Sequence, residues 1–260
     1  MEESSQHQQE ANFVTAGYVI NAFRTPDGVE EFRPLIIYGP LGYGKSTYAF
    51  KVGVNVLRRL YGYEEGRAWE EVKKFTVFRP VEFMEKVEWI DKTYGRFPFI
   101  IWDDAGIWLH AMDWHDEYVV AVQKWLNVAR THLGSIIFTT PTPGWLIGKI
   151  RYFPNIVSIK IYKKDSEGKD LPRGVRRAAA YKAWLAPDMK KSGVKLLWID
   201  TFHVRMPDDF YAWYKPRRDQ YEKMARDMVR QAWDNVSKKK KLEVIDQTPE
   251  VTEEELYRYL

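Results

Sequence analysis

Short apolar runs alternate with longer amphipathic stretches from Pro34 onward. Short runs between Pro, Gly or polar residues predict buried strands, and apolar residues on one face of a longer stretch predict helices. The expected strands are 35–38, 75–78, 99–102 and 135–138. The expected helices are 46–60, 80–94 and 118–132. This alternation predicts an α/β fold of three layers, with a mostly parallel central sheet and ligands at the carboxyl ends of its strands.

The pattern changes after residue 155, where strand-like runs follow one another without helices between them. The segments NIVSIKIY, RAAAYKAWLA and KLLWIDTFHV are separated by turn-rich stretches, so we expect them to extend the sheet, partly in antiparallel orientation. One domain is expected over 13–236, between a flexible N-terminus (1–12) and a charged C-terminal tail (237–260). Its parts are a core (34–162), a strand-rich extension (155–206) and a closing helix (207–236).

The stretch GPLGYGKST follows the first expected strand and opens the first expected helix. It fits the pattern G-x-x-x-x-G-K-[ST], in which glycines let main-chain N–H groups approach phosphates at the positive end of a helix dipole. The residues predicted to bind a polyphosphate are Gly39, Pro40, Leu41, Gly42, Tyr43, Gly44, Lys45, Ser46 and Thr47. Lys45 would neutralise the terminal phosphates, and the Ser46 hydroxyl would bind Mg²⁺. A glycine turn before an ordinary surface helix is the weaker alternative, because the motif lies between a strand and a helix.

Two adjacent carboxylates, Asp103 and Asp104, end the expected strand 99–102. Two neighbouring charges at a buried strand end are costly without a cation. Asp103 is therefore predicted to hold Mg²⁺ through water, and Asp104 to orient and deprotonate an attacking water, a role that the longer glutamate side chain fills more often. An Asp-rich turn before Gly106 is the plainer alternative.

Hydroxyl and guanidinium groups are candidates for the rest of the site. Thr139 and Thr140 end the strand expected beside the aspartates, where one of them would sense hydrolysis; hydroxyls that merely close a strand before Pro141 are an equal alternative. Arg151 and Arg130 are candidates for an arginine that reaches the γ phosphate of a neighbouring subunit, and Arg151 is favoured. An exposed surface charge remains the alternative for either arginine.

The composition narrows the chemistry. The 260 residues include no cysteine, which excludes disulfides, thiolate nucleophiles and cysteine zinc sites. His110, Asp113, His115 and Asp116 lie close together in the sequence among Trp, Leu and Met residues, without a fixed ligand spacing. We expect this segment to form an amphipathic loop over the nucleotide edge or a partner contact, and not a metal site.

The distribution of charge and hydropathy bears on location and partners. No apolar stretch approaches the roughly 20 residues that span a bilayer, and the N-terminus has no signal-peptide pattern, so a soluble intracellular protein is expected, with no membrane partner. The net charge is +4. Ten basic and four acidic residues occupy 215–241, whereas 242–260 carry six acids. A solvated helix with a flexible tail and a patch that meets phosphates both fit this segment. Thr252 and Glu255 would cap a further short helix.

The segments GPLGYGKST, FIIWDDAG and IIFTTPTP, in this order, resemble the Walker A, Walker B and sensor 1 motifs of AAA+ P-loop ATPases. They are most similar to the DnaA and DnaC/IstB-like initiator and helicase-loader group. The segment MPDDFYAWYKPRRDQYEKMARD looks like the DnaA-like ATPases of archaeal viruses and plasmids. The resemblance covers 34–162 well and the rest loosely. It implies ATP and Mg²⁺ as cofactors, a homo-oligomeric ring or filament, DNA as partner, and a helicase, replication or packaging protein as a further partner.

The chain departs from the family at several positions. Threonine or Pro141 stands where a sensor asparagine is common, and Asp104 replaces the commoner glutamate. Strands follow Arg151 where a helical lid is expected, and no residue is assigned as the sensor 2 arginine, for which Arg176 and Arg177 are candidates. The leading hypothesis is an ATPase that acts on DNA in replication initiation or helicase loading. The alternatives are a packaging or morphogenesis translocase of the FtsK/HerA or Zot-like group, and a small-molecule or nucleotide kinase.

Overall fold

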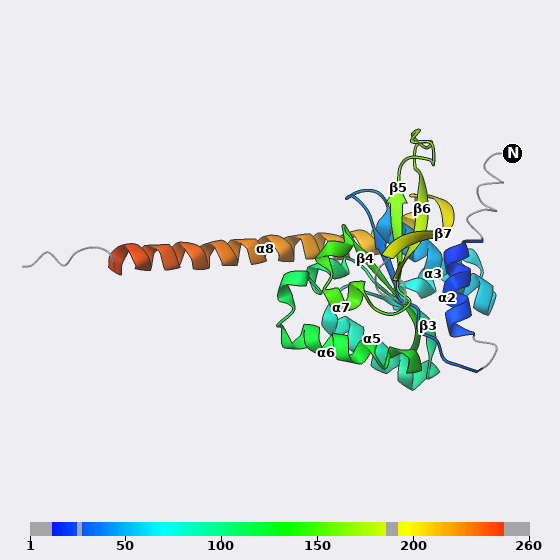
Figure 1. Cartoon of the computed structure of the whole chain (residues 1–260), viewed down its shortest axis with the longest axis horizontal. Coiled ribbons are helices and arrows are strands. Elements are labelled where there is room, and N and C mark those ends of the chain that lie inside the picture. Colours follow the sequence, from blue (N-terminus) through cyan, green and yellow to red (C-terminus); the bar gives the residue numbers. More distant parts are fainter. Residues whose placement is uncertain (1–11, 25–27, 186–191, 247–260) are drawn as a thin grey trace, which may run out of the picture. The chain divides into compact units, whose positions relative to one another are not determined.

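The computed structural model describes residues 12–24, 28–185 and 192–246 (Figure 1). The chain divides into two compact units, Met1–Met206 and Pro207–Leu260. The predicted cap at Thr252 and Glu255 lies outside the described residues.

The first unit contains a seven-stranded sheet in the order β2-β3-β4-β1-β5-β6-β7. Strands β2 to β5 and β1 are parallel to one another, and β6 and β7 are added in antiparallel orientation. The strand bounds are β1 Leu35–Tyr38, β2 Thr76–Val77, β3 Phe97–Trp102, β4 Leu133–Thr140, β5 Val157–Tyr162, β6 Val175–Leu185 and β7 Ser192–His203. One strand, β4, separates β1 from β3. The predicted fold, a mostly parallel sheet extended by antiparallel strands, is confirmed.

Helices cover both faces of the parallel strands. The helix bounds are α2 Val14–Phe23, α3 Lys45–Tyr61, α4 Glu65–Lys74, α5 Pro80–Tyr94, α6 Glu117–Leu126 and α7 Gly148–Arg151. Right-handed crossovers place α3 on one face and α5 and α6 on the other. Every residue of β3 and β4 is buried, because these strands lie between two helical layers. By contrast, β5 alternates buried and half-buried residues, which shows that only one of its faces is fully covered.

Several element boundaries differ from those the sequence predicts. The expected helix 118–132 ends at Leu126, because the chain turns through a 3-10 segment before β4 begins at Leu133. Strand β2 has two residues instead of four, because α4 continues to Lys74. Neither α2 nor α4 is predicted from the apolar pattern.

A buried carboxylate joins three elements of the first unit. Asp200 on β7 accepts hydrogen bonds from the Val14 and Thr15 main-chain N–H groups at 2.8 and 3.1 Å, and so caps the start of α2. The Tyr48 hydroxyl on α3 donates to Asp200 Oδ2 at 2.6 Å. Burial, and next the charge of Asp200, raise the pKa of Tyr48 well above its usual value. The Trp198 Nε1 group donates to Thr15 Oγ1 at 2.7 Å. Strand β7 is thereby tied to the helix that follows the glycine-rich loop.

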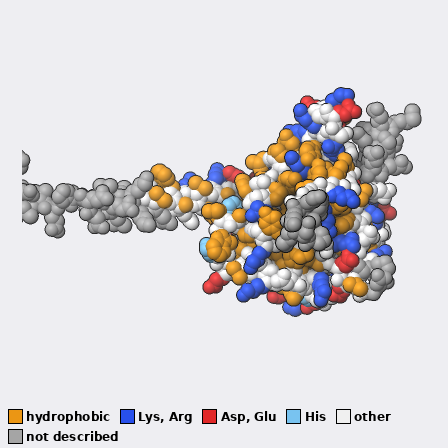
Figure 2. Space-filling model, viewed as in Figure 1, with side chains coloured by type: hydrophobic (Ala, Val, Ile, Leu, Met, Phe, Trp, Pro, Cys, Tyr) orange, Lys and Arg blue, Asp and Glu red, His pale blue; other side chains and the backbone are white. Residues whose placement is uncertain are grey.

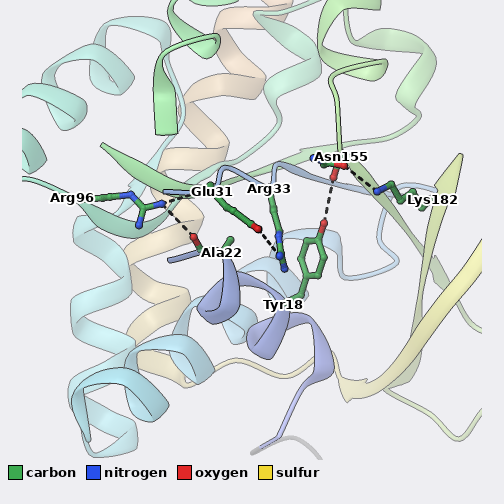
Figure 3. Close-up of polar contacts among 7 residues, drawn as sticks. All are labelled: Tyr18, Ala22, Glu31, Arg33, Arg96, Asn155 and Lys182. Atoms are coloured by element: carbon green, nitrogen blue, oxygen red, sulfur yellow. Dashed lines mark hydrogen bonds and ion pairs between the residues drawn. The ribbon is translucent and has the colours of Figure 1, made fainter. Parts of the chain in front are cut away.

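Long polar side chains tie segments together at the amino ends of the parallel strands (Figure 3). Arg96 donates to the main-chain carbonyls of Phe23, Ala22 and Glu31 at 2.8, 3.2 and 2.7 Å. On the other side of α2 in Figure 3, Asn155 accepts from the Tyr18 hydroxyl at 3.3 Å and from Lys182 Nζ at 3.1 Å. These contacts hold α2 and the loop before β5 against the sheet.

The second unit contains the helix α8, Asp208–Asp246, of 39 residues. It extends beyond the predicted end at residue 236, into the segment predicted to be a charged tail, because its Lys-rich continuation consists of good helix formers. Pro216 lies inside the helix and cannot donate a main-chain hydrogen bond there. Among the described helices, none combines the length and the apolar character needed to cross a bilayer.

Candidate nucleotide-binding site

The glycine-rich loop, residues 39–47 (here the phosphate loop), connects the carboxyl end of β1 to the start of α3. Gly39, Gly42 and Gly44 all have positive φ angles, of 150°, 74° and 89°. Gly44 also lies too close to Val204 for a side chain, since a Cβ there would be 2.7 Å from Val204 Cγ1. The glycines are therefore required by the main-chain path, which turns the first N–H groups of α3 toward one place.

Lys45 is the first residue of α3 and is only 6% exposed. Its Nζ donates to the Pro40 carbonyl at 3.2 Å, so the ammonium group lies over the loop that it is predicted to serve. The loop itself is anchored to the neighbouring strand end, because the Gly39 N–H donates to the Pro141 carbonyl at 3.2 Å. A buried cation at the start of a helix, beside a glycine-rich loop, favours an anion with several negative oxygens.

The two aspartates lie at the carboxyl end of β3, on the same edge of the sheet as the phosphate loop. Asp103 is 1% exposed, and its Oδ1 accepts from the Thr139 hydroxyl at 2.7 Å. The same hydroxyl oxygen accepts from the Asp104 main-chain N–H at 2.8 Å. Asp104 is in the left-handed region with φ 49°, which ends the strand sharply. Thr139 thus fixes the geometry of both acidic residues.

The two threonines that the sequence leaves as equal candidates have different surroundings. Thr140 Oγ1 donates to the Thr142 carbonyl at 3.0 Å and lies against Gly106, where a Cβ would be 2.6 Å from it. Thr139 contacts the aspartates, whereas Thr140 holds the turn that follows its own strand. Neighbouring residues of a strand point to opposite faces, so only one of the pair can face the acids.

Residues of this edge fit a nucleotide with Mg²⁺. Because β4 lies between β1 and β3, two strand spacings, about 10 Å, separate the end of β1 from that of β3. Ser46 in the phosphate loop and Asp103 provide hydroxyl and carboxylate oxygens, the ligand type that Mg²⁺ prefers. Among the described residues, no cluster of three or more His, Asp or Glu side chains suits a metal held by protein alone. Ser46 and Asp103 would therefore supply only part of the Mg²⁺ ligands, and the phosphates of a bound nucleotide would supply others.

The candidate arginines lie elsewhere on the chain. Arg130 lies in the 3-10 segment just before β4, at the amino ends of the strands, and the eight residues of β4 put about 25 Å between it and the opposite edge. Arg151 ends α7, with its guanidinium carbon 5.4 Å from the centre of the Tyr152 ring. Arg130 is thus too far to serve the phosphate loop of its own chain, and the prediction for both arginines concerns a neighbouring subunit.

Of the two sensor 2 candidates, only one faces the phosphate-loop helix. Arg176 pairs with Phe202, a residue that lies 3.5 Å from the position of a Cβ on Gly44. Arg177 is the next residue along β6 and therefore points to the opposite face.

The histidine-containing segment forms a loop between β3 and α6. His110 Nδ1 accepts from the Met112 N–H at 3.2 Å, and the His110 and Trp145 ring centres are 6.1 Å apart. Met112 and Trp114 are 76% and 60% exposed. His110 is therefore engaged in the loop's own structure, while large apolar side chains are left at its surface.

Sequence comparison relates the chain to proteins of archaeal viruses. It is 30% identical over 220 residues to protein B-251 of Sulfolobus spindle-shape virus 1, covering 85% of either chain. It is 28% identical over 137 residues to protein ORF286 of Acidianus two-tailed virus, covering 52% of this chain and 45% of the relative. No family model matches the chain.

Structure comparison gives distant similarities to several solved structures. The N-terminal domain of zonular occludens toxin from Neisseria meningitidis is matched over 69% of this chain and 97% of its own, with a TM-score of 0.36 and 15% identity. The genome packaging NTPase B204 from Sulfolobus turreted icosahedral virus 2, in complex with ATP-gammaS, is matched over 67% of this chain and 100% of its own. The TM-score is 0.36 and the sequence identity is 14%. The KaiC-like protein PH0186 from Pyrococcus horikoshii OT3 is matched over 64% of this chain and 82% of its own, with a TM-score of 0.33 and a sequence identity of 14%.

Proposed function

The chain belongs to the family of protein B-251 of Sulfolobus spindle-shape virus 1, and we propose that it is an ATPase that binds Mg·ATP and acts on viral DNA. One observation carries the ATPase proposal. The glycine loop with its buried lysine follows β1, and the Asp103–Thr139–Asp104 cluster lies at the ends of β3 and β4 on the same edge of the sheet.

The residues of this edge divide the chemistry between them. The N–H groups of the phosphate loop and the Lys45 ammonium would bind the β and γ phosphates and stabilise the charge that develops on them. Ser46 and Asp103 would hold Mg²⁺, which neutralises the phosphates when bound. The Asp104 carboxylate would take a proton from the attacking water, and Thr139 would keep Asp104 in position through its main-chain N–H.

Two roles on DNA remain distinct. The AAA+ initiator and loader role is supported by the order of the segments GPLGYGKST, FIIWDDAG and IIFTTPTP in the chain. The packaging or morphogenesis translocase role is favoured by the antiparallel strands β6 and β7, which follow β5 where an AAA+ chain has a helical lid. Both roles require assembly on DNA with an arginine from a neighbouring subunit, and Arg151 is our first candidate for it.

The proposal is tested by measuring phosphate release from Mg·ATP with no DNA, with single-stranded DNA and with duplex. We expect slow basal turnover and stimulation by DNA. Turnover that ignores all DNA but requires a small acceptor molecule would overturn the DNA proposal and favour a kinase. Absence of any ATP binding by the purified chain would overturn the ATPase proposal.

A second measurement separates the two roles on DNA. Directional displacement of a labelled strand during ATP turnover marks a translocase. ATP-dependent assembly on DNA without displacement marks an initiator or loader.

A further inference from the structure

One face of the antiparallel extension is not covered by the helices that pack on the parallel strands. On β5, Val157, Ile159 and Ile161 are buried and the residues between them are only half-buried. The register of the sheet brings residues of β1, β6 and β7 to the same side as these half-buried positions. We call this surface the open face. The residues of this face that matter for binding are Lys160, Tyr162, Arg177, Tyr181, Val194, Leu196 and Ile199.

Apolar side chains form the part of the open face contributed by β7. Val194, Leu196 and Ile199 are 68%, 47% and 40% exposed. Such exposure of three neighbouring aliphatic residues is unusual unless the surface has a ligand or partner. Figure 2 shows hydrophobic side chains gathered over β5 and β6, with Lys and Arg side chains beside them.

Tyrosines and cations form the rest of the open face. The Tyr162 and Tyr181 hydroxyl oxygens are 3.2 Å apart. Lys160 Nζ lies 4.9 Å and Arg177 Cζ 5.5 Å from the centre of the Tyr162 ring. Burial, and next the electrostatic effect of Tyr181, raise the pKa of the Tyr38 hydroxyl. The cations are thus placed around aromatic rings instead of being spread into solvent.

The charge of the open face has one sign. The strands β1, β5 and β6 contain no Asp or Glu, and the only acid of β7 is Asp200, which points to the opposite face and caps α2. In addition, Arg177 Nε is shielded from solvent and has no hydrogen-bond partner among the described residues. A buried guanidinium N–H without an acceptor favours an anionic ligand.

We propose that the open face binds a single strand of nucleic acid, with bases on the tyrosine and aliphatic side chains and phosphates on Lys160 and Arg177. Sequence-tolerant binders of single strands combine the same two components, namely aromatic side chains on which bases stack and cations that follow the backbone. In a duplex the bases are already stacked on one another, so the aromatic component favours unpaired strands. For the DNA-dependent ATPase proposed above, the inference specifies that single-stranded nucleic acid binds and that the open face binds it. It rests on that proposal only for its biological role.

The first test measures the affinity of a fluorescein-labelled oligothymidylate by anisotropy, without ATP. Replacing both Tyr162 and Tyr181 by Ala should weaken binding about 5- to 150-fold for each base that loses its stacking partner. Tyr162→Phe keeps the ring and should stay within about 3-fold of the parent. Tyr152→Ala, which removes a 79% exposed tyrosine outside the open face, is the matched control.

The second test uses salt, because a merely structural role of the cations would not change the salt dependence. Lys160→Ala with Arg177→Ala should lower the slope of log K against log salt by about 1.4, at about 0.7 for each phosphate contact on a single strand. The control variant, Lys73→Ala with Lys74→Ala, removes the same charge from α4, which packs on α3. Its slope should equal that of the parent.

Three outcomes overturn the inference: unchanged oligothymidylate affinity in the tyrosine pair, an unchanged salt slope in the cation pair, or tighter binding of duplex than of single strand. Self-association that the open-face variants abolish, with oligonucleotide binding intact, would instead assign the face to a second copy of the chain. Failure here is distinguishable from failure of the ATPase proposal, because ATP binding depends on Lys45 and is measured without DNA.

Discussion

The two edges of the parallel sheet both carry buried or half-buried charge, yet only one has the features of a binding site. At the amino edge, Arg96 donates to four main-chain carbonyls, the fourth being that of Arg130, and Lys182 donates to Asn155, so these two cations meet neutral acceptors of the same chain. At the carboxyl edge, Lys45 lies over a loop with positive φ angles, and two aspartates share one threonine.

The difference between the edges lies in the main chain. Helix α3 points its first N–H groups toward the carboxyl edge, where they favour an anion, whereas carbonyls at the amino edge have already been paired by arginine. Charge density alone therefore does not identify a site in this fold. The combination of glycine geometry, helix start and paired acids does, and the two edges should respond differently to substitution.

The largest difference is expected for Asp104→Asn. The amide cannot accept the proton of the attacking water, so ATP turnover should fall about 10²- to 10⁴-fold while ATP affinity changes little. Single-turnover hydrolysis and equilibrium binding of a fluorescent ATP analogue measure the two quantities. Parent-like turnover in this variant would remove Asp104 from the catalytic role.

A smaller effect, on binding, is expected for Lys45→Ala. Loss of the ammonium group over the phosphate loop should weaken Mg·ATP binding about 100-fold or more, because charge-assisted contacts to phosphate are lost. Isothermal titration measures the affinity. The control variant is Lys51→Ala, which removes a lysine further along the same helix α3. Tight binding by Lys45→Ala would contradict the assignment of this edge.

The smallest effect is expected at the amino edge. Arg96→Ala removes hydrogen bonds to four carbonyls and should lower the free energy of unfolding by about 2 kcal/mol, with ATP affinity unchanged. Urea titration followed by tryptophan fluorescence measures the change, and Arg130→Ala, an exposed neighbour, should stay within about 0.5 kcal/mol of the parent. A large loss of ATP affinity in Arg96→Ala would break the proposed division between the edges.

Local patterns account for the part of the fold that the sequence predicts. The glycine loop between β1 and α3 and the antiparallel strands after residue 155 are visible in short stretches of sequence, because turn residues and apolar runs adjoin in the chain. The course of residues 75–78 and 118–132 is harder to predict, since their boundaries depend on where neighbouring strands must begin.

Contacts between distant residues account for what the sequence does not predict. Helix α2 starts at Val14, where the capping carboxylate comes from Asp200, 186 residues later. The choice between Thr139 and Thr140 depends on which face of β4 meets Asp103, which strand periodicity alone leaves open. The proximity of Val204 to Gly44 likewise follows only from the position of β7 in the sheet.

The Asp200 carboxylate has a consequence for how the first unit comes apart. It joins α2, α3 and β7 in one buried polar network, so removing β7 would take the carboxylate acceptor from the Tyr48 phenol and leave the first N–H groups of α2 without their acceptor. The antiparallel extension therefore cannot peel away while the parallel core stays intact. We expect both to melt in a single cooperative transition, with no folded fragment that ends before Asp200.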